Sequence, residues 1–253
     1  MVNLKIDRSP EPLQIRDYER LDQAPGANRL REQAVTAYFT EHCPGVFLDR
    51  VNTRAGNNII CRLNGDSKKR IVVGAHFDQK GGGHGVADNW SGIVLITRLL
   101  SELSQKKLHY TWEFVAFAGE ESDLQGSRAY VGRSLQEIRD GRIVAMINVD
   151  TLGLGPLKLD HRSDKYLQCL SERIALALDI KVTSTSLPST TGDWYPFRQK
   201  GVPVLNLHSL DRQLIGKIHS RRDTRSVIDD VMLNDAWQIL VTLQGLIDQS
   251  ERY

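Results

Sequence analysis

Long apolar runs are missing from this 253-residue chain. Its uninterrupted stretches, such as Ile93–Ile96 and Phe114–Ala118, fall far short of the roughly 20 residues that a membrane-spanning helix needs, so we expect no span and no membrane partner. The amino-terminal segment also lacks the apolar core of roughly 7 to 15 residues found in secretory signals. The sequence therefore predicts a cytoplasmic location, with a secreted or periplasmic mature form left open.

A clear excess of either charge sign is also missing. The chain has 33 Lys and Arg residues against 31 Asp and Glu residues, a net charge of +2, and its longest basic run is Lys68–Arg70. Nucleic-acid binding proteins usually carry basic patches or clusters, so we expect no nucleic-acid partner. The composition favours a small or peptidic partner instead.

Cysteine is scarce. The chain has only Cys43, Cys61 and Cys169, an odd number with no CxxC spacing. This pattern favours buried free thiols, in a reducing or redox-indifferent compartment, over a disulfide framework.

Apolar residues are abundant enough, at 40% of the chain, for one large core or at most two small ones, which excludes a disordered chain. Short apolar runs alternate with amphipathic segments in a βαβαβ order, without repeats or linkers, so we predict one α/β domain over residues 1–253 with residues 1–25 as an amino-terminal extension. The expected strands are 47–54, 58–63, 70–78, 111–118, 142–150 and 202–207, the expected helices are 27–42, 91–103, 126–138, 165–178, 194–201 and 233–249, and 183–191 is expected to be a loop.

Polar residues follow three of the expected apolar strands. One strand runs into His76 and Asp78, the next into Glu120 and Glu121, and the third into Asp150. Ligand sites of open α/β sheets lie beyond the carboxyl ends of the strands, so we expect these side chains to converge. Two carboxylates about 4 Å apart repel by roughly 4 kcal/mol at an effective dielectric constant near 20. The pattern therefore predicts a cation among them.

The segment between the first of these strands and the next helix contains Gly81–Gly85, interrupted by His84. Neither a Gly-Lys-Ser/Thr sequence nor a GxSxG motif accompanies it, which excludes a phosphate loop and a serine hydrolase. We interpret the run as a loop that lets the backbone pass close to the site, with His84 as a bystander. Asp88 follows, and by position it is either a site carboxylate or the amino-terminal cap of the helix that starts near Ser91.

Taken together, the segments VVGAHFD, ADNWSG, FAGEESDLQGSRAY, INVDTLG, GDWYPFRQKGVPV and HSRRDT resemble the M28 family of metallopeptidases, the zinc aminopeptidases of bacterial leucyl aminopeptidase type. They occur in the family's order from about Ala27 to the final helix. The resemblance implies a mixed, mostly parallel, twisted sheet between helices, the fold of the zinc-dependent exopeptidases and phosphorylase/hydrolase-like proteins.

The resemblance also implies a metal centre. His76, Asp88 and Asp150 would hold one zinc ion, and Asp88, Glu121 and His219 the other. Two Zn²⁺ ions, for which Mn or Co are substitutes, bring four positive charges against three carboxylates, and a bridging hydroxide would close the balance. Only the resemblance identifies His219 as a ligand.

Further roles follow from the same resemblance. Glu120 falls at the position of the general base, and Asp78 at that of a carboxylate supporting the first histidine. Tyr195 is either a donor to the tetrahedral oxyanion or an aromatic packing residue. The peptide bond between Asp88 and Asn89 is expected to be cis.

The expected function is therefore hydrolysis of amino-terminal residues from peptides or related aminoacyl substrates by a dizinc metallopeptidase. The same fold carries glutaminyl cyclases and carboxypeptidases, and a catalytically inactive binding domain is a further alternative. Arg221 and Arg222 are either surface residues or cations near the cleft that would favour acidic substrates.

Overall fold

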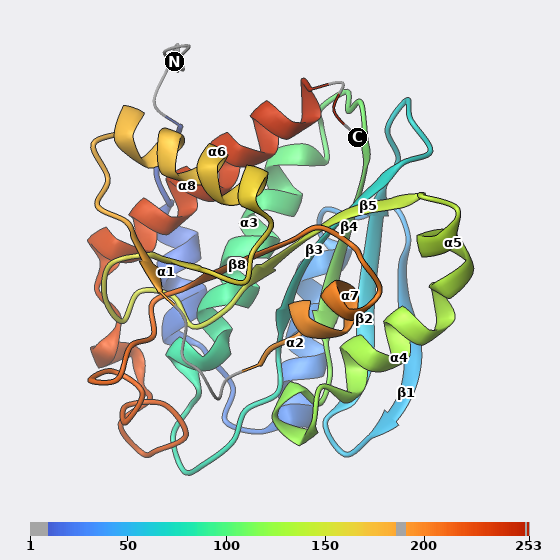
Figure 1. Ribbon diagram of the computed structural model, residues 1–253. Coiled ribbons are helices and arrows are strands. Elements are labelled where there is room, and N and C mark those ends of the chain that lie inside the picture. The colour runs from blue at the N-terminus through green and yellow to red at the C-terminus, as the bar shows by residue number, and fades with distance from the viewer. Residues whose placement is uncertain (1–9, 186–190, 251, 253) are drawn as a thin grey trace.

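The computed structural model describes residues 10–185, 191–250 and 252, and its centre is an eight-stranded sheet in the order β1-β2-β4-β3-β5-β8-β6-β7 (Figure 1). The pairs β3–β4, β3–β5, β5–β8 and β6–β7 are parallel, and the other three are antiparallel. The strands are β1 (Val46–Thr53), β2 (Gly56–Leu63), β3 (Arg70–His76), β4 (Thr111–Phe117), β5 (Ile143–Val149), β6 (Lys158–Asp160), β7 (Thr183–Thr185) and β8 (Val204–His208).

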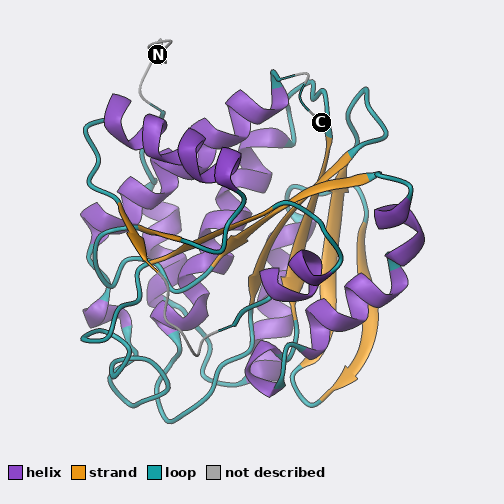
Figure 2. Ribbon diagram, in the orientation of Figure 1, coloured by secondary structure: helices purple, strands orange, loops and turns teal. Residues whose placement is uncertain are grey.

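Helices cover both faces of this sheet (Figure 2). One face packs against α1 (Ile15–Asp22), α2 (Asn28–Thr40), α3 (Ser91–Leu103), α6 (Lys165–Ala177) and α8 (Asp230–Asp248), which share the larger apolar cluster. The smaller cluster on the other face includes residues of α4 (Gln125–Arg133), α5 (Leu135–Arg139) and α7 (Trp194–Gln199). The predicted α/β fold with a mixed, mostly parallel sheet between helices is confirmed.

The three central parallel strands place the polar strand ends together. Every residue of β3 and β4 is buried, and so is all of β5 except one position, which explains why most residues of these strands are apolar. Because β3 lies between β4 and β5 and all three run in one direction, their carboxyl ends meet at the same edge.

Several elements differ from the sequence-based expectation. Helix α1 lies in the region expected to be an extension, and it packs beside α3. The expected helix 126–138 divides at Ser134 into α4 and α5. The expected loop 183–191 begins with the short strand β7, while its residues 186–190 lie outside the described part of the chain.

The prediction of three buried free thiols is wrong. Cys43, just beyond α2, forms a disulfide with Cys61 on β2, and Cys169 is a free cysteine exposed on α6. Chain folding brings the first two together over a separation of 18 residues, which the spacing alone did not indicate. Disulfides are typical of oxidising compartments, so the cysteines lend no support to a cytoplasmic location.

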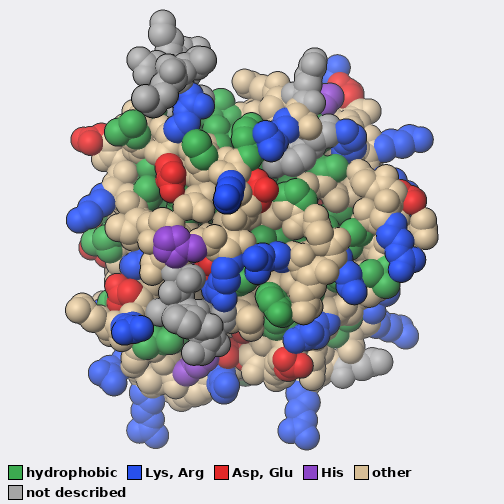
Figure 3. Space-filling view, viewed as in Figure 1, with side chains coloured by type: hydrophobic (Ala, Val, Ile, Leu, Met, Phe, Trp, Pro, Cys, Tyr) green, Lys and Arg blue, Asp and Glu red, His purple; other side chains and the backbone are tan. Residues whose placement is uncertain are grey.

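The surface fits the balanced composition. Side chains of both charge signs are interspersed on the face seen in Figure 3. Among the described helices, none has both the length and the apolar character needed to cross a bilayer.

Candidate metal centre

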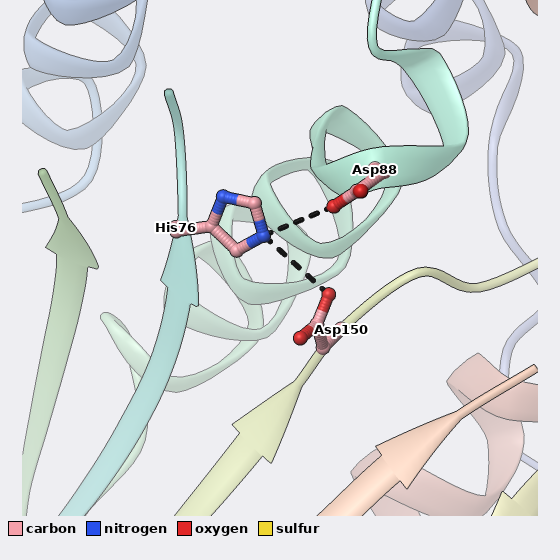
Figure 4. Close-up of side chains that lie close together, drawn as sticks. All are labelled: His76, Asp88 and Asp150. Atoms are coloured by element: carbon pink, nitrogen blue, oxygen red, sulfur yellow. Dashed lines mark ion pairs between the residues drawn. The ribbon is translucent and has the colours of Figure 1, made fainter. Parts of the chain in front are cut away.

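His76, Asp88 and Asp150 converge at the carboxyl edge of the sheet (Figure 4). His76 is the last residue of β3, Asp150 follows β5, and Asp88 lies just before α3. Nε2 of His76 is 3.1 Å from Oδ1 of Asp88 and 3.5 Å from Oδ1 of Asp150. The two carboxylates thus approach the same ring nitrogen from different elements.

A second group adjoins the first through Asp88. Nε2 of His219 is 3.0 Å from Oδ2 of Asp88 and 2.8 Å from Oε1 of Glu121. In each group, one ligand atom per residue lies within 4.8 Å of the others. Asp88 therefore directs one oxygen toward His76 and the other toward His219.

Asp78 supports this arrangement in two ways. Its carboxylate oxygens accept the backbone N–H groups of Glu120 and Glu121, at 3.1 and 3.2 Å, and so hold the turn after β4. Its main-chain carbonyl lies 3.1 Å from Nδ1 of His76, closer than its Oδ1 at 3.6 Å. A donor bond from Nδ1 to this carbonyl leaves Nε2 of His76 as the ring atom available to a metal ion.

Asn89, rather than Asp88, bonds to the start of α3. Its Oδ1 accepts the backbone N–H groups of Gly92 and Thr151, both at 3.0 Å, and its Nδ2 donates to the carbonyl of Val149 at 2.9 Å. Asp88 is thereby left free to face the two histidines, and its interpretation as a helix cap is wrong. The expected cis peptide bond between Asp88 and Asn89 is present.

The loop that carries His219 packs against the glycine-rich segment. A Cβ atom at Gly81 would lie 2.6 Å from the carbonyl of His219, and one at Gly83 would lie 2.3 Å from the carbonyl oxygen of Ser220. From the same loop, Asp223 accepts the backbone N–H groups of Ala87 and Asp88 at 2.7 and 3.2 Å. No sequence pattern indicated a role for Asp223, although it lies within the HSRRDT segment.

Arg31 holds the other side of the glycine-rich segment. Its fully buried guanidinium donates to the carbonyls of Pro25, Phe77, His84 and Gly85 and lies over the ring of Trp90. Burial lowers its pKa to about 10. Nothing in the local sequence around Arg31, on an amphipathic helix, indicated this role.

The carboxylates favour positive charge at both histidines. Asp88 and then Glu121 raise the pKa of His219 to about 10. Burial opposes charge on His76, but Glu120 and the other carboxylates around it outweigh burial and raise its pKa well above the usual value. Burial likewise opposes charge on Asp88, and the two histidines outweigh it and lower its pKa. A metal cation would satisfy the same demand for positive charge.

Glu120 and Asp193 are acidic groups beside this centre. Burial raises the pKa of Asp193 to about 7. Burial also raises the pKa of Glu120 well above its usual value, opposed by His76 and reinforced by Asp193 and Asp150. Asp193 lies one residue before α7, and no sequence pattern indicated a role for it.

A pocket opens beside the metal centre. Trp194 lines it, whereas Tyr195 does not and instead meets Trp194 edge-on with ring centroids 5.8 Å apart. Tyr195 therefore gains no support as an oxyanion donor. Arg221 and Arg222 also lie outside the lining, and the arginine that lines the pocket is Arg162.

The donor set fits a divalent metal. Imidazole nitrogens and carboxylate oxygens suit zinc and related ions. Oε1 of Glu121 is buried and has no hydrogen-bond partner among the described residues, although it lies 2.8 Å from Nε2 of His219. A cation held between these two atoms would give this oxygen the partner that it lacks.

Comparison with known proteins agrees with this geometry. The model of peptidase family M28 matches residues 58–243, which is more than half of the chain and includes all five residues of the two groups. The chain belongs to peptidase family M28. A probable leucine aminopeptidase of Trichophyton verrucosum is 31% identical over 54% of this chain and 41% of its own length. The chain thus spans less than half the length of this curated relative.

Solved structures share the fold of this chain. A zinc aminopeptidase from Bacillus subtilis superposes with a TM-score of 0.69 at 22% identity, over 78% of this chain and 51% of the other. A glutaminyl cyclase from an Acidobacteriales bacterium has a TM-score of 0.77 at 20% identity and matches 97% of this chain and 99% of its own. The predicted resemblance to the M28 family is therefore confirmed.

Proposed function

We propose that this M28 chain is a dizinc metallopeptidase that removes amino-terminal residues from peptides. The observation that carries the proposal is the position of Asp88, whose two carboxylate oxygens lie 3.1 and 3.0 Å from the histidines of two different groups. A carboxylate shared in this way is suited to bridging two cations. Three protein donors per group would leave coordination positions for water and substrate, as a catalytic rather than a structural zinc requires.

His76, Asp88 and Asp150 would hold one zinc ion, and Asp88, Glu121 and His219 the other. Bound zinc would polarise the scissile carbonyl and lower the pKa of a water molecule. The carboxylates of the chain would balance most of the charge of the two ions, since three of them face two divalent cations.

Glu120 is the residue that we assign to proton transfer. It lines the pocket together with Asp88 and Asp150, and the hydrogen bond from its backbone N–H to Asp78 fixes the turn on which it stands. Its carboxylate would accept a proton from the attacking water and then deliver it to the nitrogen of the leaving amine.

The test compares zinc-loaded and chelator-stripped protein on aminoacyl substrates and on the same substrates with a blocked amino group. We expect two zinc ions per chain, hydrolysis only with zinc, and a requirement for the free amine. Glu120→Gln should retain both ions and lose roughly 10²- to 10⁴-fold in kcat. Unchanged turnover in this variant would exclude the proton-transfer role.

A glutaminyl cyclase is the second candidate, because the Acidobacteriales cyclase matches this chain almost end to end. The two activities give different products from a peptide with amino-terminal glutamine: hydrolysis releases free glutamine, whereas cyclisation releases ammonia. A count of one zinc per chain together with ammonia release would favour the cyclase.

A further inference from the structure

The pocket beside the candidate metal centre is lined by both apolar and polar side chains. Trp194, Leu210, Ile215 and Ile218 supply the apolar side chains. Asn206 and His208, both on β8, supply polar ones, and Arg162 joins them from the turn after β6.

His208 presents a buried hydrogen-bond donor without a partner. Its Nδ1 accepts the backbone N–H of Leu210 at 3.1 Å, so the proton of the neutral ring resides on Nε2. The residue is 5% exposed, and Nε2 has no hydrogen-bond partner among the described residues. Burial lowers the pKa of His208, which keeps the ring neutral. A buried donor left unpaired is costly, so a ligand that supplies an acceptor gains from binding here.

Asn206 and Arg162, which line the same pocket, carry donors as well, while the carboxylate of Asp160 in that lining is paired with Arg162. Oδ1 of Asn206 accepts from Nδ2 of Asn148 at 3.0 Å, which leaves Nδ2 of Asn206 to donate to a ligand. The guanidinium of Arg162 is held by Asp160, with N–O distances of 2.8 and 2.6 Å, and lies 4.7 Å from the ring centroid of Trp194. This fixed cation adds to an environment that favours oxygen acceptors.

We propose that His208, with Asn206 and Arg162, selects substrates whose first side chain ends in a carbonyl or carboxylate oxygen. The inference rests on the proposed function, because the pocket is continuous with Glu120 and the metal centre. The apolar side chains of the pocket accommodate the methylene groups of such a substrate side chain. The terminal oxygen of that side chain accepts a hydrogen bond from Nε2 of His208. Glutamine and glutamate have this combination, whereas methionine has a similar length without the oxygen.

The experiment measures kcat/KM of the zinc-loaded enzyme for four aminoacyl p-nitroanilides, those of glutamine, glutamate, methionine and leucine. We expect kcat/KM for the better of the glutamine and glutamate substrates to exceed that for the methionine substrate by about 10- to 100-fold. This ratio corresponds to the cost of leaving one buried donor unpaired. If the glutamine substrate is the better of the two, the preferred acceptor is a carbonyl oxygen. If the glutamate substrate is better, the preferred acceptor is a carboxylate oxygen. Methionine or leucine as the best substrate would overturn the inference.

Two substitutions at His208 distinguish a role in substrate selection from a role in supporting the structure. His208→Phe keeps a ring but removes the donor. It should lower kcat/KM for the glutamine and glutamate substrates to the value for the methionine substrate, while the methionine substrate is still hydrolysed. His208→Gln keeps a donor at a similar reach and should preserve the preference. An equal loss on all four substrates in both variants would show a structural role instead and overturn the inference.

A binding measurement distinguishes this inference from the proposed function. Calorimetric titration of the zinc-loaded Glu120→Gln variant, which lacks the proposed proton-transfer group, with the amides of the same four amino acids ranks pocket preference with hydrolysis suppressed. If none of the p-nitroanilides is cleaved, the proposed function fails, while tighter binding of the glutamine or glutamate amide still supports the inference. Tighter binding of the methionine or leucine amide refutes it.

Discussion

Asn89→Ala should both destabilise the fold and disturb the metal centre. Asn89 is fully buried, and its side chain ties the segment that carries Asp88 to the end of β5, on which Asp150 stands. The substitution leaves three backbone groups without their partner, the N–H groups of Gly92 and Thr151 and the carbonyl of Val149.

Each unpaired buried group costs about 1 to 2 kcal/mol, so the expected loss in the free energy of unfolding is about 3 to 6 kcal/mol. In a chain of this size, a loss of 4 kcal/mol lowers Tm by roughly 8 to 16 °C. Metal binding should weaken as well, because two ligands are attached to the segments that separate. Scanning calorimetry gives the stability, and equilibrium dialysis against zinc gives the affinity and the number of ions.

Leu100→Ala is the matched control, since Leu100 is fully buried near the far end of α3. It should cost about 2 to 5 kcal/mol and leave zinc affinity unchanged. Asn89→Ala with a Tm within 2 °C of the wild type would refute the hydrogen-bond reasoning. A large loss of stability with unchanged zinc affinity would refute the link between Asn89 and the metal centre.

Three further changes test other parts of the structure. Reduction of the Cys43–Cys61 disulfide should cost about 3 kcal/mol, or roughly 6 to 12 °C in Tm by scanning calorimetry, whereas Cys169→Ser should leave Tm unchanged. Arg31→Met removes the donor to four backbone carbonyls and should lower the free energy of unfolding by about 3 to 5 kcal/mol in urea titrations. Gly83→Ala forces a Cβ atom against a backbone oxygen 2.3 Å away and should reduce zinc in dialysis from the proposed two ions per chain toward one.

The central strands were predictable because a strand buried on both faces consists mainly of apolar residues. β3 and β4 are mostly apolar, with Glu113 a charged residue inside β4, and the polar residues that follow them could only lie at the carboxyl edge of the sheet. Helix α1 was not predictable in this way, since two of its three buried residues are the charged Asp17 and Arg20. Arg20 pairs with Glu41 at 2.8 Å and lies over the ring of Tyr38, and these are contacts that only the folded chain defines.

The residues of the two candidate metal-binding groups also differ in how far the sequence predicted them. His76, Glu121 and Asp150 follow directly from the strand ends, because the sheet order brings those ends together. Asp88 was ambiguous, and the neighbouring Asn89 resolves it by taking the hydrogen bond at the helix start. The pairing of the cysteines and the polar residues of the pocket depend on contacts between distant segments, and spacing along the chain does not predict such contacts.

Among the residues of the two candidate metal-binding groups, His219 is the one that no local pattern could reveal, and the reason lies in a feature that the sequence did contain. It stands in a loop far from any strand end, with a positive φ of 53°. That loop reaches Asp88 because the glycine-rich segment offers no side chains at Gly81 and Gly83, where the backbone of residues 219–220 passes. Asp223 then fixes the loop by accepting the N–H of Asp88. The glycine run and the histidine, more than a hundred residues apart, are therefore one structural feature, because the second group forms only where both backbones meet.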